Sequence, residues 1–450
     1  MARKLFGTDG IRGVAGEFPL DPLTAHAFGN ALGHWAREHD SDPEVVIGMD
    51  TRESGPWLAA QVAGGLAQRG IKARFAGLIT TPGVAYLTRT QHFVAGVMIS
   101  ASHNPYHDNG LKAFDHSGFK LPDDQELLIE KEIFALREAG VEPVAAQLVV
   151  DESLDKAYVD FLASTVSCSF AGRRVVLDCA NGAASHLATE LFERLGATVI
   201  AVGCEPNGRN INLNTGALHI ENLRSEVLKQ KADIGVAFDG DADRAILVSH
   251  SGKIIDGDSV LLVLANSMHG SGRLAASDGS PLVVATVMSN LGLERALREG
   301  GIELVRTPVG DKYVLEEMVR RGALIGGEQS GHVIFREFAT TGDGMLTALR
   351  VMEIVQKTGR DLDDLTSGFQ IYPQLLVNVK VKDRKPLSEL PAVQEEIRLA
   401  EESFGDTGRV LVRFSGTEPL ARVMVEGPEL SKVEHFADRI AGAIRMELGG

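Results

Sequence analysis

The chain has 450 residues, and at ordinary domain sizes this length predicts roughly three or four domains. A formal net charge of −16 argues against nucleic acid or an anionic membrane surface as the main partner, although a local basic pocket for a phosphorylated metabolite is compatible with it. Cys168, Cys179 and Cys204 lack metal-ligand spacing, and no apolar stretch approaches membrane-spanning length. With no signal-peptide pattern at its start, the sequence predicts a soluble cytoplasmic protein.

The first motif along the chain is FGTDGIRG at residues 6–13. Its glycines let backbone amides and the Arg12 guanidinium approach an anion, although a plain glycine-bearing turn would look similar. The segments that follow are typical of strands at 45–50 and 72–78 and of helices at 57–68 and 82–90. This alternation predicts right-handed βαβ units in an α/β sheet.

The apolar run 94–99 is typical of a buried strand, and the motif SASHNP follows it at residues 100–105. Ligands collect beyond the carboxyl ends of strands in open α/β sheets, so Ser102 stands where chemistry is expected. Its hydroxyl could act as a nucleophile, with His103 or Lys112 handling protons or developing charge. A loop whose Ser and Asn cap a helix or close a turn is the alternative.

A second unit carries a run of carboxylates. Its predicted elements are strands at 174–179, 197–202 and 233–238 and a helix at 183–195. The last strand runs into DGDADR, where Asp239, Asp241 and Asp243 alternate with small residues and can converge on one hard cation. A calcium EF-hand needs Gly and Glu where Arg244 and His250 stand, so Mg²⁺ is the favoured ion. A solvated acidic turn is the alternative.

A third unit repeats the pattern of strand and helix. Its predicted elements cover residues 281–288, 291–299, 302–307 and 312–321. The motif GEQSGH at residues 327–332 offers an acid, an amide, a hydroxyl and an imidazole to sugar hydroxyls, or it forms a plain polar hairpin. Three units that each end a buried strand in a polar loop predict three related α/β domains facing a shared cleft.

The tail has a different pattern, which indicates a small α+β domain. Its predicted strands are 375–381, 409–414 and 420–426, and its predicted helices are 386–402 and 430–448. The turn at 415–419 offers two hydroxyls and a glycine amide, and Arg413 and Arg422 flank it as two forks for bidentate phosphate binding. A simple hairpin turn is the alternative.

The motifs FGTDGIRG, SASHNP with DNGLK, DGDADR, GEQSGH followed by TTGDG, and RFSGTEP occur in this order from end to end of the chain. Together they resemble the α-D-phosphohexomutase superfamily. The resemblance implies three Rossmann-like mixed α/β domains and a smaller α+β C-terminal domain around a central cleft. The expected domains are residues 1–150, 151–255, 256–368 and 369–450. Met49, Thr215 and Phe414 depart from the family pattern, and only Phe414 falls beside an expected binding loop.

The resemblance also implies an enzyme that transfers phosphate between two positions of a hexose through a phosphoserine and a bisphosphorylated sugar. Ser102 would be the phosphoserine, and its phosphate would bind one Mg²⁺ together with Asp239, Asp241 and Asp243. The residues implied in the transfer are Arg12, His103 and Lys112. The residues implied in binding the substrate are Arg244, Glu328, Ser330, His332, Arg413, Ser415, Gly416, Thr417 and Arg422.

Gln329 favours an amino sugar as substrate, since relatives that act on glucose or mannose phosphates usually carry Met at that position. The implied reaction is the interconversion of glucosamine 6-phosphate and glucosamine 1-phosphate for UDP-N-acetylglucosamine and cell-wall precursor synthesis. A phosphomannomutase or phosphoglucomutase, and a catalytically silent homologue that only binds sugar phosphates, are the alternatives. The oligomeric state, monomer or homodimer, is left open.

Overall fold

The computed structural model describes residues 4–7, 9–383, 385–415 and 419–449. Contacts between residues divide the chain into two units. The larger unit comprises residues 1–287 and 302–366, and the smaller comprises residues 288–301 and 367–450. Within the described ranges, no helix is both long enough and apolar enough to cross a membrane.

The first sheet of the larger unit has six strands in the order β1-β2-β6-β5-β3-β4. β3 lies parallel to β4 and β5, whereas β6 runs antiparallel to both β5 and β2. The strands are β1 (Phe6–Gly7), β2 (Gly10–Val14), β3 (Glu44–Met49), β4 (Lys72–Leu78), β5 (Ala95–Ile99) and β6 (Asp108–Asp115). The helices of this region are α1 (Pro22–His39), α2 (Gly55–Gln68), α3 (Thr81–Thr90), α4 (Asp123–Glu138) and α5 (Glu152–Ser164).

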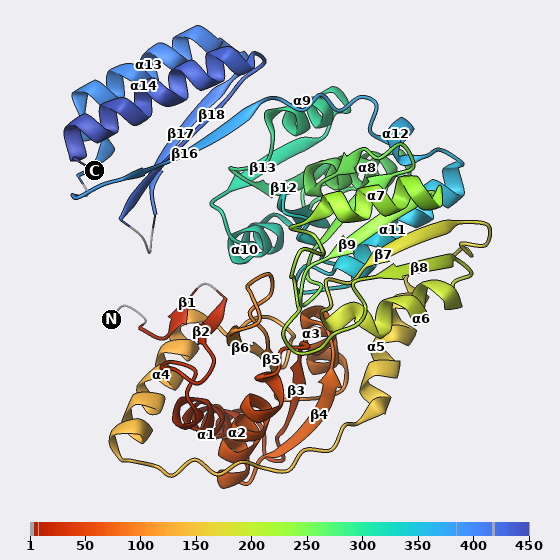
Figure 1. Ribbon diagram of the computed structural model, residues 1–450, viewed down its shortest axis with the longest axis vertical. Helices are drawn as coiled ribbons and strands as arrows, with labels where there is room; N and C mark the ends of the chain where they lie inside the picture. Colours follow the sequence, from red (N-terminus) through yellow and green to blue (C-terminus); the bar gives the residue numbers. More distant parts are fainter. Residues whose placement is uncertain (1–3, 8, 384, 416–418, 450) are drawn as a thin grey trace. The chain divides into compact units, whose positions relative to one another are not determined.

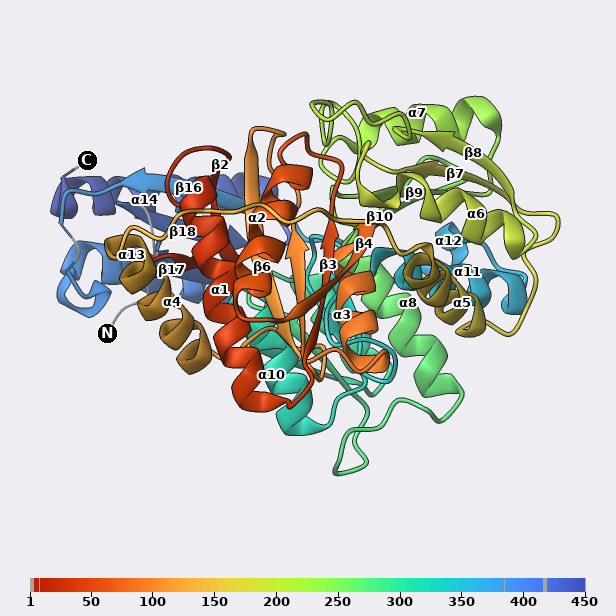
Figure 2. The same cartoon turned by 90° about the horizontal axis from the view of Figure 1, so that it is seen from below.

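Side chains of β3 alternate between the two faces of this sheet, as the period of two in a strand requires. Val45 and Ile47 belong to the core that packs against α1 and α2, which lie side by side over the sheet in Figure 2. Gly48 faces α3, where an added Cβ would lie 2.6 Å from a methyl of Val84. The sheet is therefore covered on both faces, and polar residues are left to the loops at its strand ends.

The second sheet has the order β11-β10-β9-β7-β8 and the third has the order β13-β12-β14-β15. The strands of the second sheet are β7 (Arg174–Asp178), β8 (Thr198–Val202), β9 (Ile234–Phe238), β10 (Ala245–Ser249) and β11 (Ile254–Ile255). The strands of the third are β12 (Leu282–Thr286), β13 (Glu303–Thr307), β14 (Ile325–Gly327) and β15 (Val333–Phe335). The remaining helices of this unit are α6 (Leu187–Arg194), α7 (Ile220–Gln230), α8 (Gly257–Gly270), α10 (Asp311–Arg321), α11 (Gly344–Thr358) and α12 (Leu362–Leu365).

The smaller unit is built on a three-stranded antiparallel sheet in the order β16-β18-β17. Two helices, α13 and α14, run side by side along this sheet (Figure 1) and bury its apolar side chains. The elements are α9 (Leu291–Glu299), β16 (Gln374–Lys380), α13 (Pro391–Phe404), β17 (Arg409–Phe414), β18 (Leu420–Glu426) and α14 (Leu430–Leu448). The side chain of Glu426 accepts a hydrogen bond from the Leu291 amide at 2.8 Å, which joins α9 to β18.

The predicted fold class is confirmed: three mixed α/β sheets with helices and a smaller α+β part. Two predicted helices differ from the observed ones by more than two residues at their starts. The helix predicted over 183–195 is a 3-10 turn at Ala183–Ser185 followed by α6. The helix predicted over 386–402 begins at Pro391, because proline lacks an amide hydrogen and is tolerated only in the first turn of a helix.

Candidate active site

Ser102 lies in the loop that follows β5, and the residue is 2% exposed. Its backbone has a φ of +53°, a left-handed conformation that costs energy for a residue other than glycine. The Ser102 amide donates to Ser100 Oγ at 2.8 Å, and Ser100 Oγ donates in turn to Asp50 Oδ2 at 2.7 Å. The loop after β5 is therefore tied to the end of the neighbouring strand β3.

Arg52, for which the sequence analysis predicted no role, binds backbone carbonyls of the same loop. Its guanidinium is buried, pairs with Asp50 at 2.9 Å, and donates to the backbone carbonyls of Ser102 and Asn104, each at 2.9 Å. It also donates to the carbonyls of Pro105 and Asp108. Asn212 adds a hydrogen bond to the Ser102 carbonyl at 2.9 Å. One planar, permanently charged group thus orients four carbonyls of the loop that carries Ser102.

We expect Arg52→Lys to lower turnover on the order of 10- to 100-fold, because a lysine cannot reproduce the fork that positions Ser102. The KM for the substrate should change little, since Arg52 does not line the pocket found in the described residues. Steady-state kinetics checks this split. Arg350→Lys is the matched control, because Arg350 also joins a carbonyl to a carboxylate but contacts Thr165 and Glu353 instead. Equal losses in both variants would contradict a positioning role for Arg52.

The carboxylates of Asp239, Asp241 and Asp243 are buried, and ligand oxygens from all three lie within 4.8 Å of one another. Asp241 Oδ1 and Asp243 Oδ1 are buried and have no hydrogen-bond partner among the described residues. Ser102 Oγ donates to Asp239 Oδ2 at 2.7 Å, so the hydroxyl reaches the same cluster. Oxygen-only donors at this spacing, with two oxygens left without partners, fit a hard cation such as Mg²⁺.

The loop 239–243, which carries the three aspartates and is called the metal loop here, closely approaches the Ser102 loop at Gly240. A Cβ added there would lie 2.4 Å from the Ser102 carbonyl oxygen, so a larger residue cannot occupy this position without displacing the backbone. A glycine between the first two aspartates is thus a requirement of packing.

Burial and the neighbouring carboxylates of Asp243 and Asp241 raise the pKa of Asp239 well above its usual value.

A chain of alternating charges borders the site. Lys112, which lies on β6 and is 1% exposed, pairs with Asp241 at 2.8 Å and with Asp9 at 3.0 Å. Lys120 pairs with Asp9 and with Asp311, each at 2.6 Å. Burial opposes the charge of Lys112, but the carboxylates of Asp241 and Asp9 raise its pKa above the ordinary value. Lys112 is therefore a permanent positive charge rather than a base.

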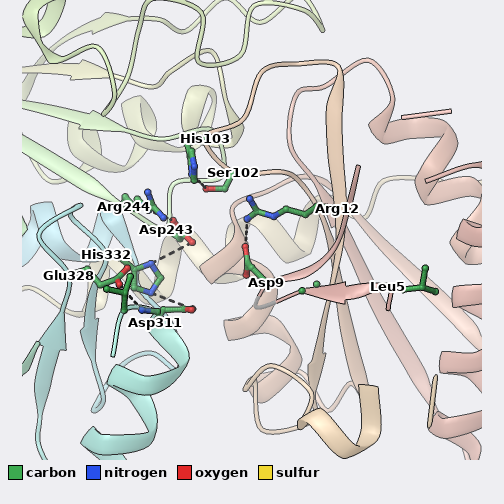
Figure 3. Close-up of a pocket in the computed structure, with 14 residues that line it drawn as sticks. Leu5, Asp9, Arg12, Ser102, His103, Asp243, Arg244, Asp311, Glu328 and His332 are labelled. Carbon is green, nitrogen blue, oxygen red and sulfur yellow. Dashed lines mark hydrogen bonds and ion pairs between the residues drawn. The ribbon is translucent and has the colours of Figure 1, made fainter. Parts of the chain in front are cut away.

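These loops line one pocket of about 400 Å³. In Figure 3, Ser102 and His103 from the loop after β5 and Asp243 and Arg244 from the loop after β9 lie across from Asp9 and Arg12. Glu328 and His332 of the β14–β15 loop and Asp311 at the start of α10 lie beside Asp243, whereas Leu5 points away. Arg12 enters from β2, where it pairs with Asp9, and His103 Nδ1 lies 3.4 Å from Ser102 Oγ. The lining residues are Leu5, Gly7, Asp9, Gly10, Arg12, Ser102, His103, Asp243, Arg244, Val309, Gly310, Asp311, Glu328 and His332.

The β14–β15 loop contributes Glu328 and His332 to the pocket, but not every residue predicted there. Glu328 Oε1 accepts from the Gly310 amide at 3.1 Å, and His332 Nδ1 lies 3.5 Å from Asp243 Oδ2. Ser330 is exposed and does not line the pocket. Gln329 donates from its side-chain amide to Asp256 Oδ2 at 3.2 Å and does not line it either. The sequence pattern located the loop, and the structure selects which side chains of the loop face inward.

Asp343 lies under the metal loop and caps α11, where its Oδ1 accepts from the Leu346 amide at 2.9 Å. Tyr158 donates to its other oxygen at 2.8 Å, and the adjacent Gly344 amide donates to the Ala242 carbonyl at 3.0 Å. Burial raises the pKa of Asp343 from 3.8 to about 6. The folded protein therefore keeps this proton to higher pH than the unfolded chain does.

This difference predicts a pH dependence of stability with a definite sign. A carboxyl whose pKa is raised on folding stabilises the fold most when protonated, so its contribution falls as pH rises from about 4 to about 6. Asp343→Asn keeps the cap through its single side-chain oxygen and places an amide nitrogen that can donate to the Tyr158 hydroxyl, but it does not titrate. The free energy of unfolding of the variant, minus that of the parent, should rise by up to about 3 kcal/mol across this interval. Urea denaturation with chelator present measures it, and a pH-independent difference would contradict the burial argument.

In the smaller unit, Arg413 and Arg422 face each other directly across β17 and β18. Like charges opposite one another on neighbouring strands are unfavourable, and burial together with Arg422 lowers the pKa of Arg413. Such an arrangement is suited to an anion that bridges the two guanidinium groups. Ser415 is buried in the same turn, whereas Gly416 and Thr417 lie outside the described residues.

Asp9 and Asp311 line the pocket although the sequence analysis did not predict a role for them. Both lie shortly beyond the end of a strand, which is the pattern that predicted the other loops. Asp311 lies four residues beyond the end of β13, next to Gly310, and Asp9 lies in the turn that joins β1 to β2. A systematic search for polar residues after each predicted strand would have included Asp311 and Arg52.

Four family models match the chain in order, and all describe the phosphoglucomutase/phosphomannomutase family. The α/β/α domains I, II and III match residues 3–140, 156–252 and 256–372, and the C-terminal domain matches residues 376–443. A phosphoglucosamine mutase of Solibacter usitatus is 64% identical over 449 residues, which cover 100% of each chain. A phosphoglucosamine mutase of Koribacter versatilis is 49% identical over 456 residues, covering 99% of this chain and 98% of that one.

Among solved structures, a phosphoglucomutase/phosphomannomutase family protein of Burkholderia thailandensis superposes with a TM-score of 0.80 at 25% identity, covering 98% of this chain and 97% of that chain. These matches span the whole sequence and agree with the strand-end loops described above. The chain belongs to the phosphoglucomutase/phosphomannomutase family, and within it to the phosphoglucosamine mutases.

Proposed function

We propose that the protein interconverts glucosamine 6-phosphate and glucosamine 1-phosphate by passing a phosphoryl group through Ser102. The observation that carries this proposal is the contact of Ser102 Oγ with Asp239 Oδ2 at 2.7 Å, which joins a strand-end nucleophile to a cluster of three buried carboxylates. The relatives at 64% and 49% identity are named phosphoglucosamine mutases, which supports the amino sugar as substrate.

Phosphorylated Ser102 would donate its phosphoryl group to the free hydroxyl of the bound sugar, forming a bisphosphate. The Ser102–phosphorus bond breaks as the new bond to the sugar oxygen forms, and the hydroxyl proton must leave. His103 is placed to handle a proton, because burial and the charges of Arg244 and Arg12 lower its pKa and favour the neutral ring. The bisphosphate then turns around and returns its other phosphate to Ser102.

Asp239, Asp241 and Asp243 would hold one Mg²⁺ together with the phosphate on Ser102. Bound there, the ion would neutralise charge on the transferring phosphoryl group. Two side chains supply further positive charge: Arg12, which lines the pocket, and Lys112, which pairs with Asp241. Positioning and preorganised charge are the main sources of catalysis in phosphoryl transfer, and this site offers both.

Binding in two orientations requires a second site for whichever phosphate is not reacting. We assign this role to Arg413, Ser415 and Arg422 of the smaller unit, with Gly416 and Thr417 between them. The support is the opposed pair of guanidinium groups, since two forks can grip one phosphate from both sides. Arg244, Glu328 and His332 are the groups available to the sugar ring.

The test is the turnover of glucosamine, glucose and mannose phosphates by the pure protein. We expect kcat/KM to be highest for glucosamine 1-phosphate. A preference for glucose or mannose phosphate would overturn the substrate assignment, and no turnover of any of them would favour a binding protein. Both alternatives are therefore decided by one set of assays.

Two neighbouring variants locate the preference for the amino group. Glu328 carries a charge into the pocket, whereas the Gln329 amide is held by Asp256. Glu328→Gln should weaken kcat/KM more for the amino sugar than for glucose phosphate, by about tenfold or more, because a hydrogen bond to a charged group is lost. Gln329→Met should leave the ratio unchanged. The reverse result would restore Gln329 as the selecting residue.

A further inference from the structure

Two cysteines that take no part in the proposed mechanism lie together at the ends of two neighbouring strands. Cys179 directly follows β7, and Cys204 lies two residues beyond the end of β8. β7 and β8 are parallel, with Asp178 opposite Val202. Between Val202 and Cys204, Gly203 has a φ of +59°, a left-handed turn that redirects the chain.

Both cysteines contact the same backbone carbonyl. The Cys179 amide donates to the Val202 oxygen at 3.1 Å, and Cys204 Sγ lies 3.3 Å from that oxygen. The pKa of each thiol responds to the other, so the two side chains lie close together. Neighbouring strands lie about 4.8 Å apart, and the Cα atoms of a disulfide lie about 4.4–6.8 Å apart. Continued by one residue, the register of β7 and β8 places Cys179 opposite Gly203, so Cys204 is one residue further along. A step of about 3.3 Å along a strand combined with the spacing between strands gives a Cα separation of roughly 6 Å, within the range of a bridge.

The two thiols differ in exposure and in pKa, which suits them to the two successive steps of disulfide formation. Cys204 is partly exposed, and its interaction with the Cys179 thiol lowers its pKa, which favours the reactive thiolate. Cys179 is buried, and its interaction with the Cys204 thiol and its burial raise its pKa well above the ordinary value. An accessible thiolate beside a protected thiol is the arrangement of an oxidisable cysteine with its resolving partner.

We infer that Cys179 and Cys204 form a reversible disulfide when the protein meets a peroxide, and that the bridge slows turnover. The Cys204 thiolate attacks the peroxide, the O–O bond breaks, and a sulfenic acid and hydroxide form. The Cys179 thiol then attacks the Cys204 sulfur, the S–O bond breaks, and water leaves as the S–S bond forms. A dithiol reductant returns both cysteines to thiols by exchange.

The bridge would act on the active site through the turn that follows Cys179. Ala180 and Asn181 have φ values of +53° and +48°, so this turn is already strained. The Ala183 amide donates to the carbonyl of Gly240 in the metal loop at 2.8 Å, and the Asn181 carbonyl accepts from Thr51 Oγ1 at 2.5 Å. A change in this turn therefore reaches both the metal loop and the segment that carries Arg52.

The experiment treats the full-length protein with hydrogen peroxide, blocks free thiols, and identifies cross-linked peptides by mass spectrometry. We expect a Cys179–Cys204 peptide pair that lacks two hydrogen atoms, together with a several-fold loss of mutase turnover that dithiothreitol reverses. The mass measurement does not depend on the proposed reaction, so failure of the mutase assignment would leave it intact.

Two variants serve as controls. Cys204→Ser should abolish the bridge and the loss of turnover, whereas Cys168→Ser should preserve both, because burial raises the pKa of the Cys168 thiol. Cys204 is the partner to replace, since it is the partly exposed one and its loss leaves the core intact. Oxidation of Cys204 to a sulfinic acid without a bridge would overturn the inference. A bridge that leaves turnover unchanged would overturn its regulatory part.

Discussion

Ser102→Ala should lower mutase turnover by on the order of 10⁴-fold or more, because no other group can carry the phosphoryl group between the two sugar positions. The protein should remain folded. Alanine tolerates the left-handed backbone at this position no worse than serine does, and the lost hydrogen bond to Asp239 costs about 1–3 kcal/mol. Steady-state kinetics and thermal unfolding of the same preparation measure the two effects.

The phosphoryl group itself should be visible in the active protein. Mass spectrometry of the parent should place one phosphate on the peptide that contains Ser102, and the alanine variant should lack it. Ser249→Ala is the matched control, because Ser249 is equally buried but lies on β10. That variant should keep both the phosphate and the turnover. Parent-like turnover by the Ser102 variant would exclude the phosphoserine mechanism.

Removal of Mg²⁺ should abolish turnover, and Mg²⁺ added back should restore it, whereas Ca²⁺ and Zn²⁺ should not. Oxygen-only ligands disfavour zinc, and a site shared with a phosphate favours a small ion that keeps some of its waters. Asp241→Asn should raise the apparent Kd for Mg²⁺ by about tenfold or more, because affinity in such sites follows the number of ligand charges. Full activity of chelator-treated protein would contradict the metal assignment.

The same prediction has a readout that does not involve turnover. An ion that binds only the folded protein stabilises it, by about 2.7 kcal/mol when its concentration is 100 times Kd. Mg²⁺ should therefore raise the unfolding midpoint of the parent and shift that of Asp241→Asn far less. Asp363→Asn is the control, since Asp363 belongs to a more exposed group with His250 and Asp361. An equal shift in the parent and in Asp241→Asn would exclude Asp241 as a ligand.

Much of the architecture is a consequence of local sequence. The strand at residues 420–426 and the helix at residues 430–448 have the bounds that their apolar patterns predict. The buried strands ahead of Ser102 and Asp239 were predicted for the same reason. A strand covered on both faces must be apolar throughout, so the point where polar residues resume marks its end and the functional loop.

The sequence could not show which polar residues meet. Arg52 acts on carbonyls of residues 102, 104, 105 and 108, and every residue has a carbonyl, so no side-chain pattern marks the four that it binds. Lys112 reaches Asp241 because β6 runs antiparallel beside β5, a pairing that depends on contacts distant along the chain. The roles of the individual side chains remain predictions for the variants above.

The sequence by itself determined the class of fold, the order of the loops and the chemical types present in each: a hydroxyl, three carboxylates, an acid with an imidazole, and paired guanidinium groups. Only the tertiary structure decided that Gln329 turns to Asp256 while Glu328 faces the pocket, and that Lys120 joins Asp9 to Asp311 at its border. Local patterns reflect burial along one element, whereas the partner of a charged side chain is set by elements that meet only when the chain has folded.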